Sequence, residues 1–376
     1  MTRMPRVPRI LIVGAGIAGL ALARALRQRG LPPEIVEREG ERDQVGTGLF
    51  LPANGVRMLR MLGLDEAVLS RGCRIPQQRV LDHRGRLLFE IDLHEIWGTT
   101  DPCVAVHRRE LHALLREAAD APIRFGTTIE SVDAGAESTH VCLSDGSVGD
   151  YDVLVGADGI HSSVRRLVFD GAGPRHVGQV SWRMVVEGGP AITTWTVMLA
   201  RGRAFLVVPI GQGRLYCYAD VNSPGREDPT DGVFHRLIEL FGDFHEPVPG
   251  ILRRLSPAEP PYFAPIDEVT SQPWVKGRVV LIGDAAHATS PNMAQGAAMA
   301  MEDALVLAEV LASGHPVAAC LTAFEARRAP RVRWVRQQTH RRDRTRNLPP
   351  TLRDSVLRIA GKHIFRANNR PLVKDA

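Results

Sequence analysis

Lysine, aromatic residues and paired cysteines are scarce in this sequence of 376 residues. Only three of the 47 basic residues are lysine (Lys276, Lys362 and Lys374), so the other 44 are arginine. Aromatic residues make up 5% of the chain, and no basic stripe with interleaved aromatics occurs, which argues against nucleic-acid binding. The excess of arginine indicates codon bias, although guanidinium groups also suit an anionic cofactor or substrate.

The five cysteines are odd in number, and none lies in a CxxC or metal-ligand spacing. We therefore expect reduced thiols, no metal site and a cytoplasmic protein. No apolar run approaches the roughly 18 residues that a membrane span needs. The basic N-terminus leads straight into a short strand, without the apolar core of a signal peptide. Apolar residues are 44% of the chain and charged residues 24%, which is typical of a globular protein.

The apolar pattern predicts an α/β fold. Residues 9–13 form a short apolar run, residues 17–29 have helical spacing, and residues 34–37 form a second strand, which together indicate a right-handed βαβ unit. Further helices are expected at 54–62, 108–119, 231–241, 296–312 and 316–345. Strands are expected as a pair in 77–91, as three strands in 123–155, as antiparallel sheet in 177–222 and singly at 278–282.

A glycine-rich loop follows the first strand at Gly14-Ala15-Gly16-Ile17-Ala18-Gly19. Gly14 permits a tight turn, Gly16 lets the backbone approach a diphosphate, and Gly19 allows close helix–strand packing. The helix that begins here points free N–H groups and the positive end of its dipole at phosphates. Glu37 closes the next strand, where its carboxylate would bind a ribose 2′-OH. The loop predicts dinucleotide binding but does not separate FAD from NAD; a tight turn before an ordinary helix is the alternative.

Two further motifs carry a resemblance to a flavoenzyme family. Asp152-Val-Leu-Val-Gly-Ala-Asp-Gly159 resembles the DG motif of flavoprotein hydroxylases, and Gly277-Arg-Val-Val-Leu-Ile-Gly-Asp-Ala-Ala-His287 resembles their second FAD motif. All three motifs occur in the family order over about residues 8–340. The chain thus resembles the single-component FAD-dependent aromatic hydroxylases of the p-hydroxybenzoate hydroxylase fold. Within that family it is similar to salicylate, 3-hydroxybenzoate and urate hydroxylases.

The resemblance implies where FAD binds. Asp284 would bond a ribityl hydroxyl, and Arg108 would approach the phosphates or the ribityl chain. Backbone N–H groups from Pro291 to Ala298 would face the pyrimidine edge of the flavin, where negative charge collects on reduction. The loop from Gly46 to Asn54 would cover the flavin. The complete set of expected cofactor-binding residues is Gly14, Ala15, Gly16, Ile17, Ala18, Gly19, Glu37, Arg38, Gly48, Arg108, Ile129, Asp158, Gly159, Gly283, Asp284, Pro291, Ala294, Gln295, Gly296 and Ala297.

The sequence departs from the family at Ala294, where many members carry glycine, and at Ala298, where many carry asparagine or cysteine. An alanine at 294 fits only if its φ is negative. Asp158 has an alternative role as a turn residue before Gly159. Glu302 and Asp303 are expected on a helix surface or as capping groups rather than as catalysts, and the nine arginines from Arg327 to Arg346 as a solvated helix face.

No catalytic base stands out, and the candidates for the substrate pocket are Arg183, Tyr216, Tyr218, His287 and Pro291. Tyr216 and Tyr218 share one strand face by the period of two. Each candidate has a structural alternative: the tyrosines, with Trp182, could be core aromatics, Arg183 could be structural, and His287 is favoured as a packing or helix-entry residue.

The resemblance implies an FAD-dependent monooxygenase that uses NAD(P)H and O₂ to hydroxylate a small aromatic or heteroaromatic substrate through a flavin C4a-hydroperoxide. The alternative is a natural-product tailoring or antibiotic-modifying oxygenase of the same fold. A flavin halogenase is disfavoured, since its Trp-x-Trp-x-Ile-Pro motif is missing and lysines are few. A simple NAD-dependent dehydrogenase and an arginine-rich binding protein do not account for the second and third motifs. The choices between NADH and NADPH and between monomer and dimer stay open.

The expected architecture is a Rossmann-like FAD-binding domain with an inserted antiparallel β-sheet substrate domain and C-terminal helices. The FAD-binding domain would comprise residues 1–75, 100–176 and 266–345, and the substrate domain residues 76–99 and 177–265. Residues 346–376 are expected to be a loosely organised C-terminal appendage.

Overall fold

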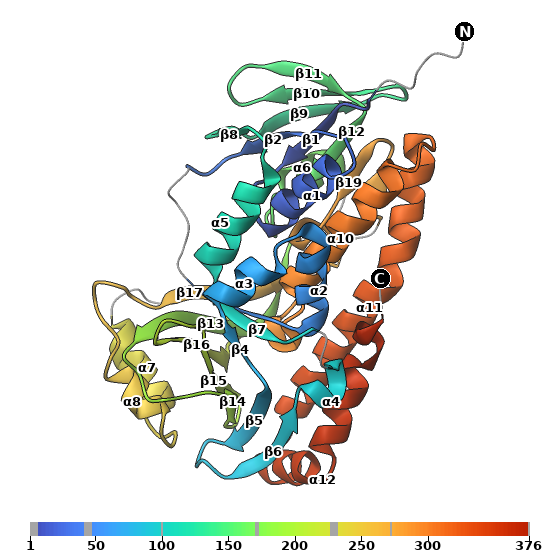
Figure 1. The fold of residues 1–376 in the computed structure, drawn as a ribbon. Helices are drawn as coiled ribbons and strands as arrows, with labels where there is room; N and C mark the ends of the chain where they lie inside the picture. Colours follow the sequence, from blue (N-terminus) through green and yellow to red (C-terminus); the bar gives the residue numbers. More distant parts are fainter. Residues whose placement is uncertain are drawn as a thin grey trace.

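The computed structural model describes residues 7–40, 47–98, 101–169, 173–225, 232–270 and 273–374, and two large sheets dominate it (Figure 1). The first has the strand order β18-β19-β12-β1-β2-β8 and is parallel except for the β18–β19 pair. Its strands are β1 (Ile10–Val13), β2 (Glu34–Glu37), β8 (Ile123–Phe125), β12 (Val153–Gly156), β18 (Val275–Lys276) and β19 (Val279–Leu281).

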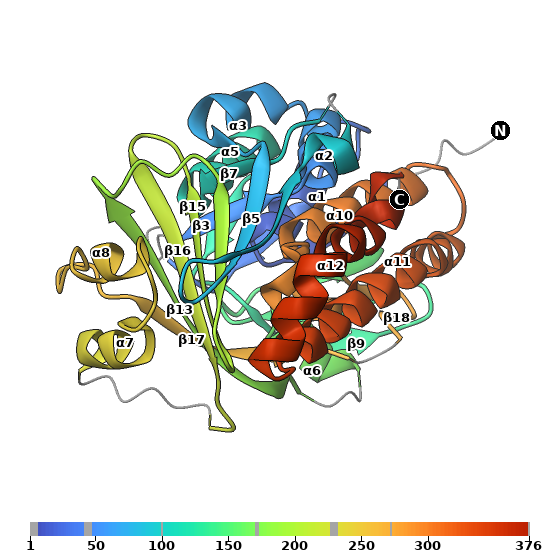
Figure 2. The ribbon, with the colours of Figure 1, turned by 90° about the horizontal axis from the view of Figure 1, so that it is seen from below.

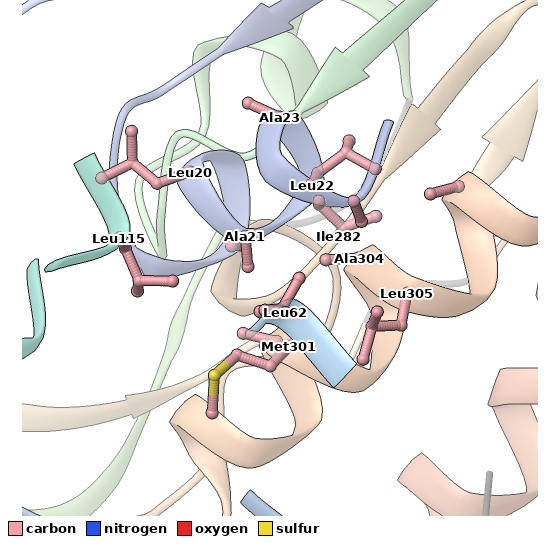
Figure 3. Packing of buried hydrophobic residues seen from close by; sticks show 14 of the residues in the cluster. Leu20, Ala21, Leu22, Ala23, Leu62, Leu115, Ile282, Met301, Ala304 and Leu305 are labelled. Carbon is pink, nitrogen blue, oxygen red and sulfur yellow. The ribbon is translucent and has the colours of Figure 1, made fainter. Parts of the chain in front are cut away.

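The central strands of this sheet are continuous apolar runs because both of their faces are buried. One face packs on four helices, α1 (Ile17–Arg27), α2 (Ala53–Leu62), α5 (Arg108–Ala119) and α10 (Gly296–Leu311). Figure 3 shows side chains of α1 and α10, with Leu62 of α2 and Leu115 of α5, in this cluster. The other face packs on α6 (Ser163–Val168) and a small antiparallel sheet of β9 (Ile129–Ala134), β10 (Thr139–Leu143) and β11 (Val148–Tyr151).

The second large sheet has the order β17-β13-β16-β15-β14-β5-β6. It is antiparallel except for the parallel β14–β5 pair, which departs from the all-antiparallel expectation. One face carries side chains such as Trp182 and Phe205 that pack on α7 (Val233–Phe241) and α8 (Val248–Leu252). Its strands are β5 (Gln77–Asp82), β6 (Leu87–Asp92), β13 (Arg175–Glu187), β14 (Trp195–Leu199), β15 (Arg203–Pro209), β16 (Arg214–Asn222) and β17 (Tyr262–Glu268).

Shorter elements connect these layers. A small three-stranded sheet consists of β3 (Gly48–Leu51), β7 (Val104–His107) and β4 (Cys73–Arg74). In the sequence, these strands come where the chain passes from one large sheet to the other. The short helices are α3 (Asp65–Arg71), α4 (His94–Trp97), α9 (Asp284–His287), η1 (Pro291–Met293) and η2 (Arg370–Val373). In the part of the chain that the structure describes, no helix combines the length and the apolar character needed to cross a bilayer.

The C-terminal region is more ordered than expected. Helix α11 (Val317–Arg346) runs the length of the molecule, and α12 (Pro350–Asn369) follows it and packs against β6 (Figures 1 and 2). The prediction of a loosely organised tail was therefore wrong. The prediction of a solvated arginine face on α11 was also wrong in part, because Arg328 and Arg346 are buried.

Local patterns located most other elements. Helices at 54–62, 108–119, 231–241, 296–312 and 316–345 and the hairpin in 77–91 are confirmed to within two residues. Residues 123–156 form five strands rather than three, because short strands are split between two different sheets. The turn at Ser144-Asp145-Gly146 joins β10 to β11 as expected.

Candidate active site

A cavity of about 1000 Å³ extends from the glycine-rich loop to the seven-stranded sheet. The loop before α1, the segment from Asp284 to Ala300 and the DG segment line one end of it. The uncovered face of the seven-stranded sheet and residues of α11 and α12 line the other end. Figure 2 shows α7 and α8 beyond one face of this sheet and α12 beyond the other. Residues of the sheet and of α12 both line the cavity, so it lies on the α12 side of the sheet.

The glycine-rich loop has the geometry that each glycine predicted. Gly14 has a φ of 108°, and a Cβ there would lie 2.5 Å from the Ala157 carbonyl oxygen. A Cβ at Gly19 would overlap the Gly14 carbonyl, so Gly19 permits the close packing of α1. By contrast, a Cβ at Gly16 would meet nothing within 4 Å, and Gly16 lines the cavity. Gly16 therefore borders open space rather than protein.

Two side chains hold this loop from outside the cavity lining. The Glu37 carboxylate accepts hydrogen bonds from the Ala15 N–H at 2.7 Å and from the Glu39 N–H at 2.9 Å. The ring nitrogen Nε2 of His112 lies 2.7 Å from the Ala15 carbonyl oxygen, which fixes Nε2 as the donor. Burial lowers the pKa of His112, which keeps the ring neutral near pH 7. It was not predicted from the sequence that His112 would support this loop. His112 ends the segment His-Arg-Arg-Glu-Leu-His, which also contains Arg108.

Arg108 and Gly48 approach the cavity from neighbouring elements. The Arg108 backbone N–H donates to the Thr47 carbonyl at 2.7 Å, while its exposed side chain lines the cavity. A Cβ at Gly48 would overlap the Tyr216 side chain, so glycine lets β3 lie against that ring. Gly46, at the start of the expected flavin-covering loop, lies outside the described residues.

The DG segment has a structural carboxylate beside an open glycine. Asp158 accepts from the Ser162 hydroxyl at 2.5 Å and from the Ser163 N–H at 2.6 Å, which holds the N-terminus of α6. Burial raises the pKa of Asp158. Gly159 has a φ of 76°, lines the cavity and would have nothing within 4 Å of a Cβ. The segment thus presents backbone, not the Asp158 carboxylate, to the cavity.

The third motif reaches the cavity from β19 to α10. Asp284 is exposed at the start of α9 and lines the cavity, as do Pro291, Gly296 and Ala297. Ala294 also lines it, but its φ is 51°, so the expectation of a negative φ was wrong. The backbone takes the left-handed conformation after η1 although the residue is alanine, at a cost of about 1–2 kcal/mol.

A buried charge network supports this segment from behind. Arg328 lies 2.8 Å from Glu302 (Nη1 to Oε2) and 2.7 Å from Asp303 (Nε to Oδ1), and all three side chains are inaccessible to solvent. Asp303 Oδ2 accepts from the Gly283 N–H at 2.9 Å and lies 2.6 Å from His287 Nε2. Burial alone would raise the pKa of Asp303, but the charges of His287 and Arg328 lower it to about 2.

This network corrects two expectations. Glu302 and Asp303 do not lie on a helix surface, because α10 is buried on nearly all sides. His287 packs on Trp274 and does not line the cavity, so it drops out as a pocket candidate. The Gln295 side chain pairs with the buried Asn54 amide (Nδ2 to Oε1, 2.9 Å), and Asn54 also donates to Glu302 at 3.2 Å.

The substrate end is formed by a row of side chains that crosses the whole sheet. Cross-strand pairing places one residue of each strand in this cross-sheet row, and all of them line the cavity. From β17 to β6 the row is Tyr262, Arg183, Tyr218, Leu206, Val197, Val80 and Phe89. Trp182 points to the opposite face and packs on Phe263 in the core, so only the two tyrosines of the three aromatic candidates reach the cavity.

Tyr218 and Asp220 form an acidic site in the cavity wall. Asp220 is buried, lines the cavity and is ion-paired with Arg346. Burial, aided by Asp343 and opposed by Arg346, raises the pKa of Asp220 to about 6. Burial and the Asp220 charge hold the pKa of Tyr218 well above its usual range, and the Tyr218 hydroxyl has no normal hydrogen bond to any described residue. Asp220 was missed, although the period of two that linked Tyr216 to Tyr218 continues to it.

Of the expected cofactor-binding residues, eleven line the cavity. These are Gly16, Ile17, Ala18, Gly48, Arg108, Gly159, Asp284, Pro291, Ala294, Gly296 and Ala297. The others lie behind or beside it: Ile129 is buried in the core, and Arg38 is exposed and ion-paired with Glu39. Arg183, Tyr216, Tyr218 and Pro291 reach the cavity among the pocket candidates.

The cavity fits a dinucleotide that carries an extended aromatic group. Within the described residues, neither α1 nor α10 has a side chain that caps its N-terminus, and neither has an acidic residue in its first turn. Both N-termini line the same cavity, so their free N–H groups and positive dipole ends can meet a diphosphate and an electron-rich ring. Added Cβ atoms at Gly16, Gly159 and Gly296 would all enter open space, which marks a path of close backbone approach.

Comparisons with known proteins agree with this geometry. The protein family described as FAD binding domain matches residues 8–339. The chain is 38% identical to the 2-heptyl-3-hydroxy-4(1H)-quinolone synthase of Pseudomonas aeruginosa, over 88% of this chain and 87% of that protein. It is 32% identical to the FAD-dependent urate hydroxylase of Klebsiella pneumoniae, over 86% of each chain.

The fold is similar to that of solved structures. Klebsiella pneumoniae HpxO, crystallised with FAD and uric acid, superposes with a TM-score of 0.86 at 27% identity, covering 97% of each chain.

Proposed function

Because this chain belongs to the family of FAD-dependent aromatic hydroxylases and is an FAD-dependent monooxygenase, we propose that it uses NAD(P)H and O₂ to hydroxylate a small heteroaromatic ring. One observation carries the proposal: a single cavity joins the uncapped N-termini of α1 and α10 to the cross-sheet row. The relative that synthesises a hydroxyquinolone supports a quinolone-like ring as the substrate.

In this proposal FAD lies along the three motifs. The N–H groups at the start of α1 and the guanidinium of Arg108 would hold its diphosphate. Asp284 would hold a ribityl hydroxyl, and the free N–H groups at the N-terminus of α10 would bind the flavin ring. Residues 1–75, 100–176 and 266–345 would form the FAD-binding domain, and residues 76–99 and 177–265 the substrate domain. Because residues of α12 line the cavity, we assign residues 350–369 to the substrate site as well.

When bound, FAD supplies the redox chemistry, accepting a hydride from NAD(P)H and activating O₂. The residues of this chain provide binding and proton handling. Arg183 and Tyr218 offer donors to a ring oxygen, and the sheet and α12 keep bulk water from the ring. Asp220 lies in the same cavity wall as Tyr218, and its carboxylate, which is ionised above about pH 6, would accept a proton that leaves the ring.

We also propose that the protein works in the cytoplasm. All five cysteines are free thiols, and Cys103, Cys217 and Cys320 are buried, which suits a reducing compartment.

The proposal is tested with purified protein and 4(1H)-quinolone derivatives. We expect a yellow protein with stoichiometric FAD, ring-stimulated NAD(P)H oxidation, and a product that gains one oxygen atom from labelled O₂. A colourless protein that cannot be reconstituted with FAD would overturn the assignment. NAD(P)H oxidation that yields only hydrogen peroxide for every ring tested would overturn the hydroxylation of this ring class.

A further inference from the structure

The cross-sheet row changes character halfway across the sheet. Its β17, β13 and β16 members, Tyr262, Arg183 and Tyr218, all carry hydrogen-bonding groups. Its remaining members, from β15 to β6, are purely hydrocarbon. Since strands lie about 4.8 Å apart, the four apolar strands span about 14 Å, and α12 packs directly on their β6 end. This is a polarity step within one continuous cavity, not a separate pocket.

Helix α12 covers the apolar half of the row. Leu357, Ile364 and Phe365 line the cavity from the helix side, opposite the sheet. Gly361 brings the helix backbone so close that a Cβ would overlap the Phe89 ring of β6. We call the space between the row from Leu206 to Phe89 and these three α12 residues the hydrocarbon chamber.

The position of the chamber decides what it can hold. The third flavin motif adjoins the β17 edge of the sheet, where the Val269 N–H donates to the Ala288 carbonyl at 2.9 Å and the Thr289 hydroxyl donates to Glu268 at 3.0 Å. The reacting ring therefore belongs beside the polar half of the row. A substituent that extends from the ring along the row passes Tyr218, which is the last polar member of the row. Beyond Tyr218 the substituent enters the hydrocarbon chamber. A polar substituent would lose its hydration there without a partner from the row, whereas an apolar one gains from burial.

We propose that the substrate ring carries a hydrocarbon chain, which lies in the hydrocarbon chamber while the ring's polar group meets Arg183 and Tyr218. This inference rests on the proposed function, since it assigns the apolar half of the same substrate site. It makes Val197, Val80 and Leu357 specificity-determining residues: they select the chain and take no part in the chemistry.

Binding of a homologous series to the FAD-loaded enzyme tests the proposal without turnover. The probes are 4(1H)-quinolones that carry hydrogen, methyl, propyl, pentyl or heptyl at carbon 2, and dissociation constants come from the perturbation of flavin absorbance. Each methylene should tighten binding by up to about fourfold, so that pentyl should exceed hydrogen by up to about a thousandfold. A terminal carboxylate on the longest chain should remove most of this gain. A flat series in the FAD-loaded protein would overturn the chamber assignment, as would equally tight binding of an unsubstituted fused tricyclic ring.

Two variants fill the chamber from opposite walls. Leu357→Trp acts from α12 and Val197→Phe from the sheet, and each should lower the heptyl-to-hydrogen affinity ratio at least about tenfold while the unsubstituted ring binds as before. Ile359→Trp is the matched control, because Ile359 is on the same helix but 89% exposed. Equal effects of Leu357→Trp and Ile359→Trp, or no effect of either filling variant, would contradict the proposal.

The two proposals fail in different ways. If chain length controls affinity but no oxygenated product forms, the chamber stands and the proposed reaction falls. If the unsubstituted ring is hydroxylated but chain length changes neither affinity nor KM, the reaction stands and the chamber assignment falls.

Discussion

Arg328→Met should destabilise the protein by about 3–5 kcal/mol at pH 7, because it leaves a buried charge without its partner. Arg328 lies between Glu302 and Asp303, and none of the three side chains is exposed to solvent. After the substitution Glu302 keeps Arg331 at 2.8 Å, and Asp303 keeps only the Gly283 N–H and His287. The two carboxylates then share Arg331 and His287, so the cluster has lost one positive charge.

The pH dependence follows from the same geometry. In the parent protein the pKa of Asp303 is lowered to about 2 from 3.8, so its ionised form contributes about 2 kcal/mol of stability above pH 4 that is lost as the pH falls towards 2. Without Arg328 this pKa should rise. The stability deficit of Arg328→Met should therefore be smaller at pH 5 than at pH 7, because protonation of the cluster relieves the buried charge.

Urea unfolding with saturating FAD, followed by circular dichroism, measures this deficit. The matched control is Arg327→Met on the same helix, whose ion pair with Glu309 at 2.8 Å is largely exposed and should contribute below about 1 kcal/mol. Adding Glu302→Gln to Arg328→Met should recover stability, because it restores the charge balance. If Arg328→Met cost no more than Arg327→Met, or if its deficit did not change with pH, the charge argument would be refuted.

The Gly16→Ala variant should be as stable as the parent, because its Cβ would meet nothing within 4 Å. The dissociation constant of FAD, measured by fluorescence titration, should nevertheless rise at least about tenfold, since the methyl group enters the path of the diphosphate. Ala294→Gly should raise the free energy of unfolding by about 1 kcal/mol, because alanine is strained at a φ of 51°; an unchanged value would contradict this. Asp220→Asn should be compared with the parent from pH 4 to pH 7. Burial raises the pKa of Asp220 from 3.8 to about 6, so its protonation stabilises the folded state below about pH 4 and this contribution is lost as the pH rises through 6. The parent should lose about 3 kcal/mol relative to the variant over that range, and a constant difference would count against the raised pKa.

The βαβ unit and the flavin motifs were predictable because their signals are local. Three glycines within six residues fix the loop before α1, and two of them are required by contacts that the loop makes with itself and with Ala157. Ala294 shows the limit of that reasoning. Its residue type alone predicted a negative φ, whereas the turn between η1 and α10 imposes a positive one. Tertiary constraints outweigh an intrinsic preference of about 1–2 kcal/mol.

The substrate end was harder to predict because its contacts join distant parts of the chain. The period of two along β16 places Tyr216, Tyr218 and Asp220 on one face. The residues of neighbouring strands that lie beside them depend on the pairing register, which the sequence of one strand does not determine. The pairing of β14 with β5 joins Val197 to Val80 across more than one hundred residues of chain. Helix α12 did leave a local signal, since Pro350 begins it and Leu357, Gly361 and Phe365 recur at helical spacing. From the sequence alone, these three residues do not indicate a binding site, because a narrow apolar face among charged residues is equally typical of an ordinary surface helix. Their role becomes apparent only when the structure places them opposite the apolar strands. The helix and the row thus define the hydrocarbon chamber jointly, and substitutions on either wall should change the same chain-length preference.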